Sequence, residues 1–74
     1  MMNEKEFLEK VGLNVRVERT KKGLSQEELA GFIESNQRYI SLIEKGDQNT
    51  TLSLLFKISE ALKTEPYKFL KFDE

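Results

Sequence analysis

Three planar polar side chains, Asn36, Gln37 and Arg38, stand directly before the apolar residues Ile40 and Ile43. Two amides and a guanidinium hold several hydrogen-bond donors in fixed geometry, and the amides add acceptors. A surface that only faces water would be served as well by Glu and Lys, which the chain uses freely elsewhere. The stretch therefore indicates directional hydrogen bonding to a partner.

Catalytic and metal chemistry find little support in the composition, because the 74 residues include no cysteine and no histidine. This excludes disulfides, thiolate or imidazole metal sites and nucleophile–histidine pairs. No pair of carboxylates stands in an apolar setting suited to acid–base catalysis. The sequence therefore predicts that the protein is not an enzyme and has no catalytic residue, metal site or cofactor.

The net charge of −1 does not favour binding to a polyanion, but the charge is unevenly distributed. Residues 10–22 carry a local charge of +4, whereas residues 1–9 and 23–35 carry −2 and −3. A basic segment of this kind attracts phosphates locally, whatever the total charge. The alternative is an ordinary solvated helix face.

The first ten residues are acidic and lack an apolar run, so no signal peptide is expected. The longest apolar runs elsewhere are two or three residues, far too short to span a bilayer. Together with the absence of cysteine, these features predict a soluble cytoplasmic protein.

Five helix-sized segments without strand-like alternation predict an all-α fold, in one domain spanning residues 1–74. The first runs from about residue 3 or 4 to residue 22 and ends before Gly23. The second opens with a capping box, in which Ser25 accepts from the backbone N–H of Glu28 and Glu28 reaches back.

The remaining three segments also carry start and stop signals. The third covers about residues 36–45 and ends before Gly46, which suits the left-handed conformation past a helix end. The fourth begins after its cap, Thr51. The fifth covers about residues 65–72, with Pro66 at its first helical position.

The second and third segments are joined by about three residues, and such a short turn forces the helices to cross steeply. This predicts a helix-turn-helix at about residues 25–45. In combination, GLSQEELA, YISLIEKG and a trailing LxxLxKIxxAL resemble the phage-repressor-like family, also called the Cro/CI or xenobiotic-response-element type. The resemblance extends over about residues 7–70, and the chain is also similar to controller proteins of restriction–modification systems. It implies a compact five-helix, lambda-repressor-like DNA-binding domain and a transcriptional regulator of double-stranded DNA.

The resemblance places four side chains of the third segment in the major groove: Gln37, Arg38, Ser41 and Leu42. Gln fits the N6/N7 edge of adenine and Arg the O6/N7 edge of guanine, each by two hydrogen bonds. The alternative is that Gln37 and Arg38 are ordinary surface residues of a first turn. Leu42 either meets a thymine methyl or sugar or is a plain exposed leucine.

Contacts to the DNA backbone are implied for Gln26, Asn36, Tyr39, Asn49, Thr51 and Arg16. Tyr39 either reaches a phosphate or packs within the protein. Arg19 and Glu44 occupy positions that pair beneath the surface in the family, so a change at either alone would cost several kcal/mol. Glu34 stands where the family usually has glycine, which predicts a strained residue with positive φ or a rearranged turn.

A single short domain that reads one half-site gains little specificity, so a homodimer on a palindromic operator is expected. The apolar residues in excess of a small core are assigned to the dimer interface: Leu54, Tyr67, Phe69, Leu70 and Phe72. The alternative is that they fold back into the core of the monomer.

A competing hypothesis is a helix-turn-helix protein-interaction module, or an antitoxin-like partner, in which DNA binding is secondary or absent. The acidic overall charge favours it. No set of pocket-lining residues is evident, so no small-molecule effector is predicted.

Overall fold

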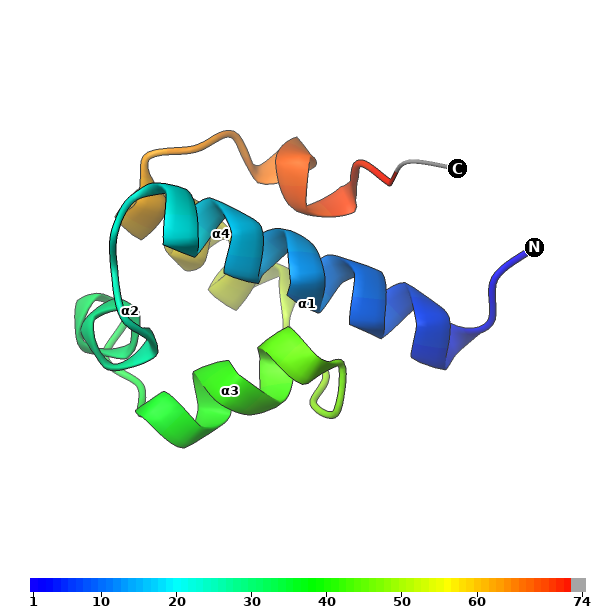
Figure 1. The fold of residues 1–74 in the computed structure, drawn as a ribbon, viewed down its shortest axis with the longest axis horizontal. Coiled ribbons are helices and arrows are strands. Elements are labelled where there is room, and N and C mark those ends of the chain that lie inside the picture. The colour runs from blue at the N-terminus through cyan, green and yellow to red at the C-terminus, as the bar shows by residue number, and fades with distance from the viewer. Residues whose placement is uncertain (73–74) are drawn as a thin grey trace.

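The computed structural model describes residues 1–72, which form four α-helices and a 3-10 helix with no strand (Figure 1). In order they are α1 (Glu4–Lys21), α2 (Gln26–Phe32), α3 (Gln37–Lys45), α4 (Leu52–Leu62) and η1 (Pro66–Leu70). The all-α prediction is confirmed. The fifth predicted helix is one 3-10 turn, shorter than expected, with Pro66 at its start and no side-chain cap from Glu65.

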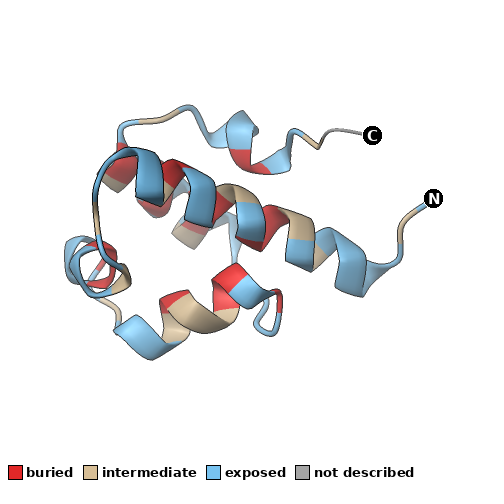
Figure 2. Ribbon diagram, in the orientation of Figure 1, coloured by how far each residue is buried: buried red, intermediate tan, exposed pale blue. Residues whose placement is uncertain are grey.

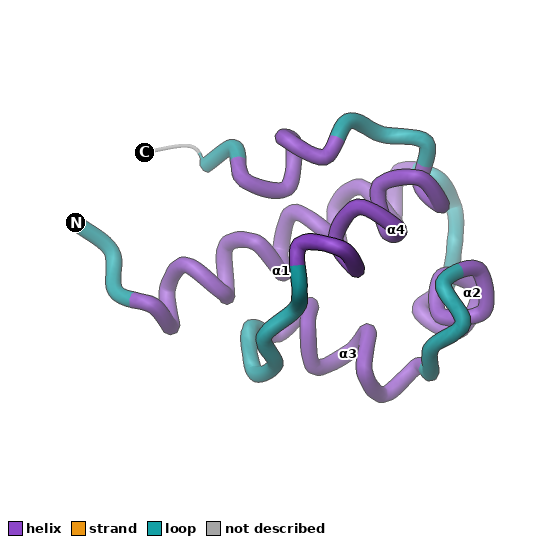
Figure 3. The backbone as a smooth tube through the Cα atoms, turned by 180° about the vertical axis from the view of Figure 1, so that it is seen from behind, coloured by secondary structure: helices purple, strands orange, loops and turns teal. Residues whose placement is uncertain are grey.

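The helices surround one core (Figure 1). Helix α1 packs against α3 on one side and against η1 on another, and α2 packs against α3 and α4. Seen from behind, α4 crosses in front of α1, with α3 at the edge (Figure 3). Helix α3 is thus supported from α1 and α2. No helix among residues 1–72 is long and apolar enough to cross a membrane.

The caps predicted at Ser25 and Thr51 are present, and α3 is also capped at its start, by Asn36 of the two candidates Ser35 and Asn36. The Glu28 backbone N–H donates to Ser25 Oγ at 3.0 Å, and Glu28 completes the capping box. The Tyr39 N–H donates to Asn36 Oδ1 at 2.9 Å, which makes Asn36 the N-cap of α3. Thr51 caps α4 in the same way at 3.0 Å. Each cap satisfies an N–H that a helix start would leave without a partner.

The turn between α2 and α3 takes the left-handed conformation at Glu34, with φ 57°, which is the first of the two outcomes expected where this residue replaces glycine. The N–H of Ser35 then donates to the carbonyl of Ala30 at 2.8 Å and closes the end of α2. Because the turn is this tight, α3 leaves it at a steep angle, and Figure 1 shows α2 nearly end-on while α3 runs across the view.

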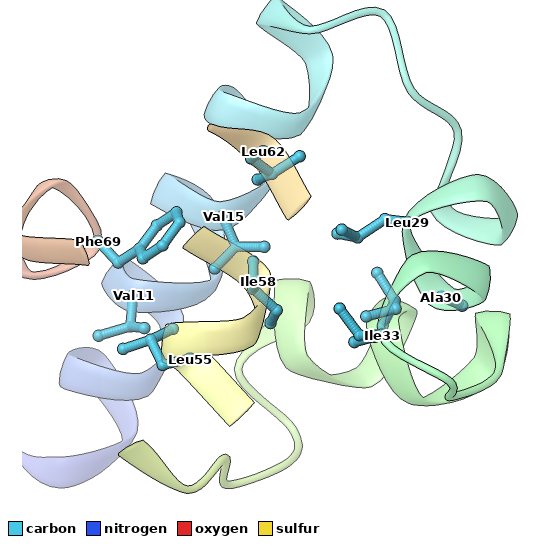
Figure 4. Close-up of a cluster of buried hydrophobic side chains, with 10 residues drawn as sticks. Val11, Val15, Leu29, Ala30, Ile33, Leu55, Ile58, Leu62 and Phe69 are labelled. Carbon is cyan, nitrogen blue, oxygen red and sulfur yellow. The ribbon is translucent and has the colours of Figure 1, made fainter. Parts of the chain in front are cut away.

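The core contains side chains from every helix (Figure 4). It consists of Val11, Val15, Leu29, Ala30, Ile33, Ile40, Leu55, Ile58, Leu62 and Phe69, each at most 6% exposed. Ile43 is also buried, so the apolar residues Ile40 and Ile43 form the buried side of α3. Burying this face against α1 and α2 leaves the opposite face of α3 toward solvent, as Figure 2 shows for its first turn.

The C-terminal segment requires a correction. Phe69 was expected at a dimer interface, but its side chain is 0% exposed and fills the core of the monomer. Asn14 Nδ2 donates to the carbonyls of Phe69 and Lys71 at 3.1 and 3.0 Å and fastens η1 to α1. Phe72 is half-buried and stacks edge-on against Phe7, with 5.6 Å between ring centroids.

Candidate nucleic-acid interface

The outward face of α3 begins with Gln37 and Arg38, both exposed. Ser41 and Leu42 follow one turn later, half-buried, and Lys45 follows after another turn and is exposed. These five residues share one face by helical spacing, while Ile40 and Ile43 are buried on the other. Glu44 lies two turns beyond Gln37 at the edge of this face and is buried against α1 and α2. The helix therefore offers a polar ridge that stands free of the core.

Gln37 and Gln26 are in direct contact across the two helices. Gln37 Nε2 donates to Gln26 Oε1 at 2.6 Å. Gln26 Nε2 in turn donates to Glu44 Oε1 at 2.9 Å. The amide of Gln26, expected on a DNA phosphate, thus already has two partners within the protein, which spacing along the sequence did not indicate.

Arg19 and Glu44 form the expected ion pair between α1 and α3. Arg19 Nε donates to Glu44 Oε2 at 2.7 Å and Arg19 Nη2 donates to Oε1 at 3.1 Å. The side chains are 13% and 3% exposed, and Arg19 Nη1 also donates to the carbonyl of Leu24 at 2.7 Å. Removing one partner of such a pair leaves a buried charge and costs about 3–5 kcal/mol.

The hydrogen bonds to Glu44 raise the pKa of Arg19, burial opposes the shift, and the charge of Glu44 adds to it. A cation whose pKa is raised on folding stabilises the folded state below its unfolded pKa. That contribution is lost only when the pH rises through the higher folded value. Arg19 is therefore charged throughout the neutral range, and its pair with Glu44 joins α1 to α3 there.

The residues expected on the DNA backbone lie around this ridge. Asn36 is exposed at the start of α3, and Asn49 and Thr51 are exposed in and after the loop that follows it. The hydroxyl of Tyr39 donates to the carbonyl of Asn49 at 3.3 Å, so Tyr39 packs back on the loop, the second of its two predicted roles. This bond ties the loop to α3.

Arg16 of α1 lies beside the ridge, where it lines a surface hollow of about 240 Å³. Its lining is Arg16, Arg19, Gln26, Ser41, Glu44 and Lys45. Lys45 is an exposed cation on the ridge that the sequence reasoning missed, although it lies one turn beyond Ser41 and two beyond Gln37. Arg16, Arg38 and Lys45 give the face its positive charge.

Gly12 also escaped notice, although a glycine within a helical pattern is a signal of close packing. A Cβ atom there would overlap the carbonyl oxygen of Ile43 and lie 2.8 Å from the carbonyl carbon and oxygen of Glu44. The backbones of α1 and α3 therefore meet at Gly12. The absence of a side chain at Gly12 allows α1 and α3 to approach this closely, and Arg19 of α1 pairs with Glu44 across the same two helices.

Comparisons with known proteins agree with this geometry. Residues 15–69 match the helix-turn-helix family model. The chain is 42% identical over 53 residues to control protein C.BamHI of Bacillus amyloliquefaciens, covering 72% of this chain and 65% of that protein. It is 40% identical over 57 residues to control protein C.SmaI of Serratia marcescens, covering 77% and 68%.

The fold superposes on the crystal structure of the restriction–modification controller protein C.AhdI from Aeromonas hydrophila with a TM-score of 0.87 and 35% identity. That match covers 92% of this chain and 99% of the other. The family model spans more than half of the sequence and includes the whole ridge. The protein therefore belongs to the helix-turn-helix family of DNA-binding transcriptional regulators.

Proposed function

We propose that the protein is a cytoplasmic homodimer of one DNA-binding domain per chain that reads a palindromic operator with α3 in the major groove. One observation carries the proposal: Gln37 and Arg38 are exposed on the first turn of a helix whose opposite face is buried. The relatives named above are controller proteins, which supports a role in transcriptional control of the same kind.

Gln37 and Arg38 are the proposed base-reading residues, with Ser41 and Leu42 one turn further along the ridge. Each bidentate contact of Gln to adenine or Arg to guanine contributes about 1–3 kcal/mol of discrimination. Half-buried Leu42 offers an apolar contact to a thymine methyl, and Ser41 can bond to any base edge.

Contacts to phosphates fix the register of the helix on the duplex. We assign them to the exposed residues Asn36, Asn49, Thr51 and Arg16, and to the second amide N–H of Gln26. Tyr39 holds the loop that presents Asn49. Few cations contribute, so non-specific binding is expected to be weak and specific binding to fall as salt rises.

The dimer is proposed to form through apolar side chains that the monomer leaves exposed near its C-terminus. Tyr67 and Leu70 are 60% and 46% exposed on η1, and Leu54 and Phe72 are half-buried beside the core. Recognition helices of a dimer lie about 34 Å apart on DNA. Two copies of a molecule measuring 35 × 22 × 20 Å can meet that spacing side by side.

Retention of genomic DNA fragments by the immobilised protein tests the proposal. Fragments are expected to bind at low salt and to elute as salt rises. Gln37→Ala and Arg38→Ala are expected to lose sequence preference while they keep weak binding. Equal retention by the wild type and both variants would favour a protein-interaction module, and any dependence on an added small molecule would contradict the absence of an effector.

A further inference from the structure

A continuous chain of hydrogen bonds runs from the buried ion pair to the exposed ridge. Arg19 from α1 donates to Glu44 of α3, and Gln26 of α2 donates to the same carboxylate at 2.9 Å. Gln37, at the start of α3, then donates to Gln26 at 2.6 Å. One end of this chain is nearly sealed from solvent, because the Glu44 side chain is 3% exposed, while Gln37 at the other end is exposed.

The charge at the buried end dictates the direction of every bond in the chain. An ionised carboxylate only accepts hydrogen bonds, so Gln26 must turn its NH₂ group toward Glu44. The carbonyl oxygen of Gln26 then faces Gln37, and an amide oxygen also only accepts. Gln37 must therefore turn its own NH₂ group toward Gln26. Two side chains that could each be flipped in isolation have a single allowed orientation here.

This orientation determines what Gln37 offers to DNA. One of its N–H groups is used on Gln26, which leaves one donor and the carbonyl acceptor. Adenine presents an acceptor at N7 and a donor at N6, which match that pair. Guanine presents two acceptors, O6 and N7, and does not.

We propose that Glu44, held by Arg19, is a specificity-determining positioning residue that acts through Gln26 to commit Gln37 to adenine. The inference rests on the proposed function, because it concerns how the ridge reads bases. With a neutral group in place of the carboxylate, the amides of Gln26 and Gln37 can flip together. Gln37 then presents two donors as readily, and guanine becomes acceptable at the same position.

The first experiment uses an operator that the wild type selects from a random pool of double-stranded DNA. It measures the affinity of each variant for this operator and for the same operator with adenine replaced by guanine at the position that Gln37 reads. That position is the one whose preference Gln37→Ala abolishes. The wild type is expected to favour adenine about tenfold or more. Gln26→Met keeps the ion pair and the length of the side chain but breaks the relay. Its preference is expected to fall below about threefold.

Asn49→Ala is the matched control, because this exposed residue is a proposed backbone contact outside the relay. It is expected to weaken binding to both operators equally and to keep the adenine preference. A wild type without any preferred sequence would refute the proposed function itself. A selective wild type with an equally selective Gln26→Met would overturn only the inference.

The role of Glu44 has its own test. The double variant Arg19→Met/Glu44→Gln removes both charges and so avoids an unpaired one. When thermal melting shows that it folds, it is expected to lose the adenine preference as Gln26→Met does, and retention of the preference would overturn the inference.

The wild type provides a readout that needs no variant. The orientation predicts NMR contacts between the side-chain amide protons of Gln26 and the guanidinium of Arg19, and their absence would also overturn the inference.

Discussion

Gln37 and Arg38 are neighbours on the ridge but are held very differently. Gln37 is bonded to Gln26 before any DNA is present. Arg38 has no hydrogen bond or ion pair from its side chain to any of residues 1–72 and is exposed. In the proposed complex with DNA, Gln37 therefore loses little side-chain entropy on binding, whereas Arg38 loses more and would gain a bidentate, charge-assisted contact. The two side chains are thus expected to contribute unequally to the rate of DNA binding and to the preference for one DNA sequence over another.

At the residue scale, Glu34 yields a stability prediction. Its left-handed conformation costs a residue with a Cβ atom about 1–2 kcal/mol, part of which glycine recovers. Glu34→Gly is expected to raise the free energy of unfolding by about 0.5–1 kcal/mol in urea denaturation. Glu34→Ala keeps the Cβ atom and is expected to give no such gain. An equal gain from both substitutions would show that the backbone at this turn is not strained.

Single residues were predictable wherever a local rule applied. The caps Ser25, Asn36 and Thr51 follow from residues a few positions apart. The positive φ at Glu34 was one of two outcomes expected from the family resemblance. The bond between Gln26 and Gln37 was not predictable, because it depends on rotamers of two helices and on a third partner, Glu44. The spacing of a motif places such residues near one another without fixing which atoms meet.

At the scale of elements, α1 supports α3, the helix proposed to read DNA. It contacts α3 at Gly12 and through Arg19, and it holds η1 through Asn14. The helix bounds followed from periodicity and capping. The last segment was predicted as a helix and is a 3-10 turn, since the five residues that begin with Pro66 are too few for a stable α-helix.

Because α1 and α3 are in close contact at Gly12, alanine substitutions at the helical glycines Gly12 and Gly31 are expected to change the stability of the protein in opposite directions. Gly12→Ala is expected to destabilise the protein by more than about 2 kcal/mol, because the new Cβ atom meets rigid backbone at Ile43 and Glu44. Gly31→Ala lies within α2 with nothing within 4 Å of the new atom. It is expected to stabilise the protein by about 0.5–1 kcal/mol through helix propensity. Thermal melting of both variants measures this, and similar melting temperatures would refute the close contact.

At the scale of the whole molecule, the exposed apolar side chains lie outside the polar ridge. They include Tyr67 and Leu70 on η1 as well as Leu52 and Phe56 on α4. Sequence reasoning found the surplus of apolar residues but placed Phe69 among the interface residues. The stated alternative, that such residues fold back into the monomer core, holds for Phe69. Which of them turn inward could not be read from periodicity, because a 3-10 turn follows neither the helical nor the strand period.

The assignment of the dimer interface to η1 predicts that Leu70→Glu shifts the protein toward monomer. The substitution removes the energy gained by burying the leucine side chain and adds the cost of desolvating a carboxylate at the contact. Sedimentation velocity over a range of concentrations measures the shift. Leu13→Glu is the matched control, since Leu13 is 54% exposed on α1 outside the proposed interface. A wild type that is monomeric at every concentration, or a Leu70→Glu protein that dimerises normally, would refute the assignment.

Selection of bound sequences from a random pool of double-stranded DNA tests the central claim most directly. The account predicts a palindromic consensus from the wild type, with half-sites about one helical turn apart. Gln37→Ala and Arg38→Ala are each predicted to lose preference at one position per half-site, an adenine and a guanine, and to keep the others. An identical consensus from all three proteins, or no enrichment at all, would contradict the claim that this ridge reads base edges.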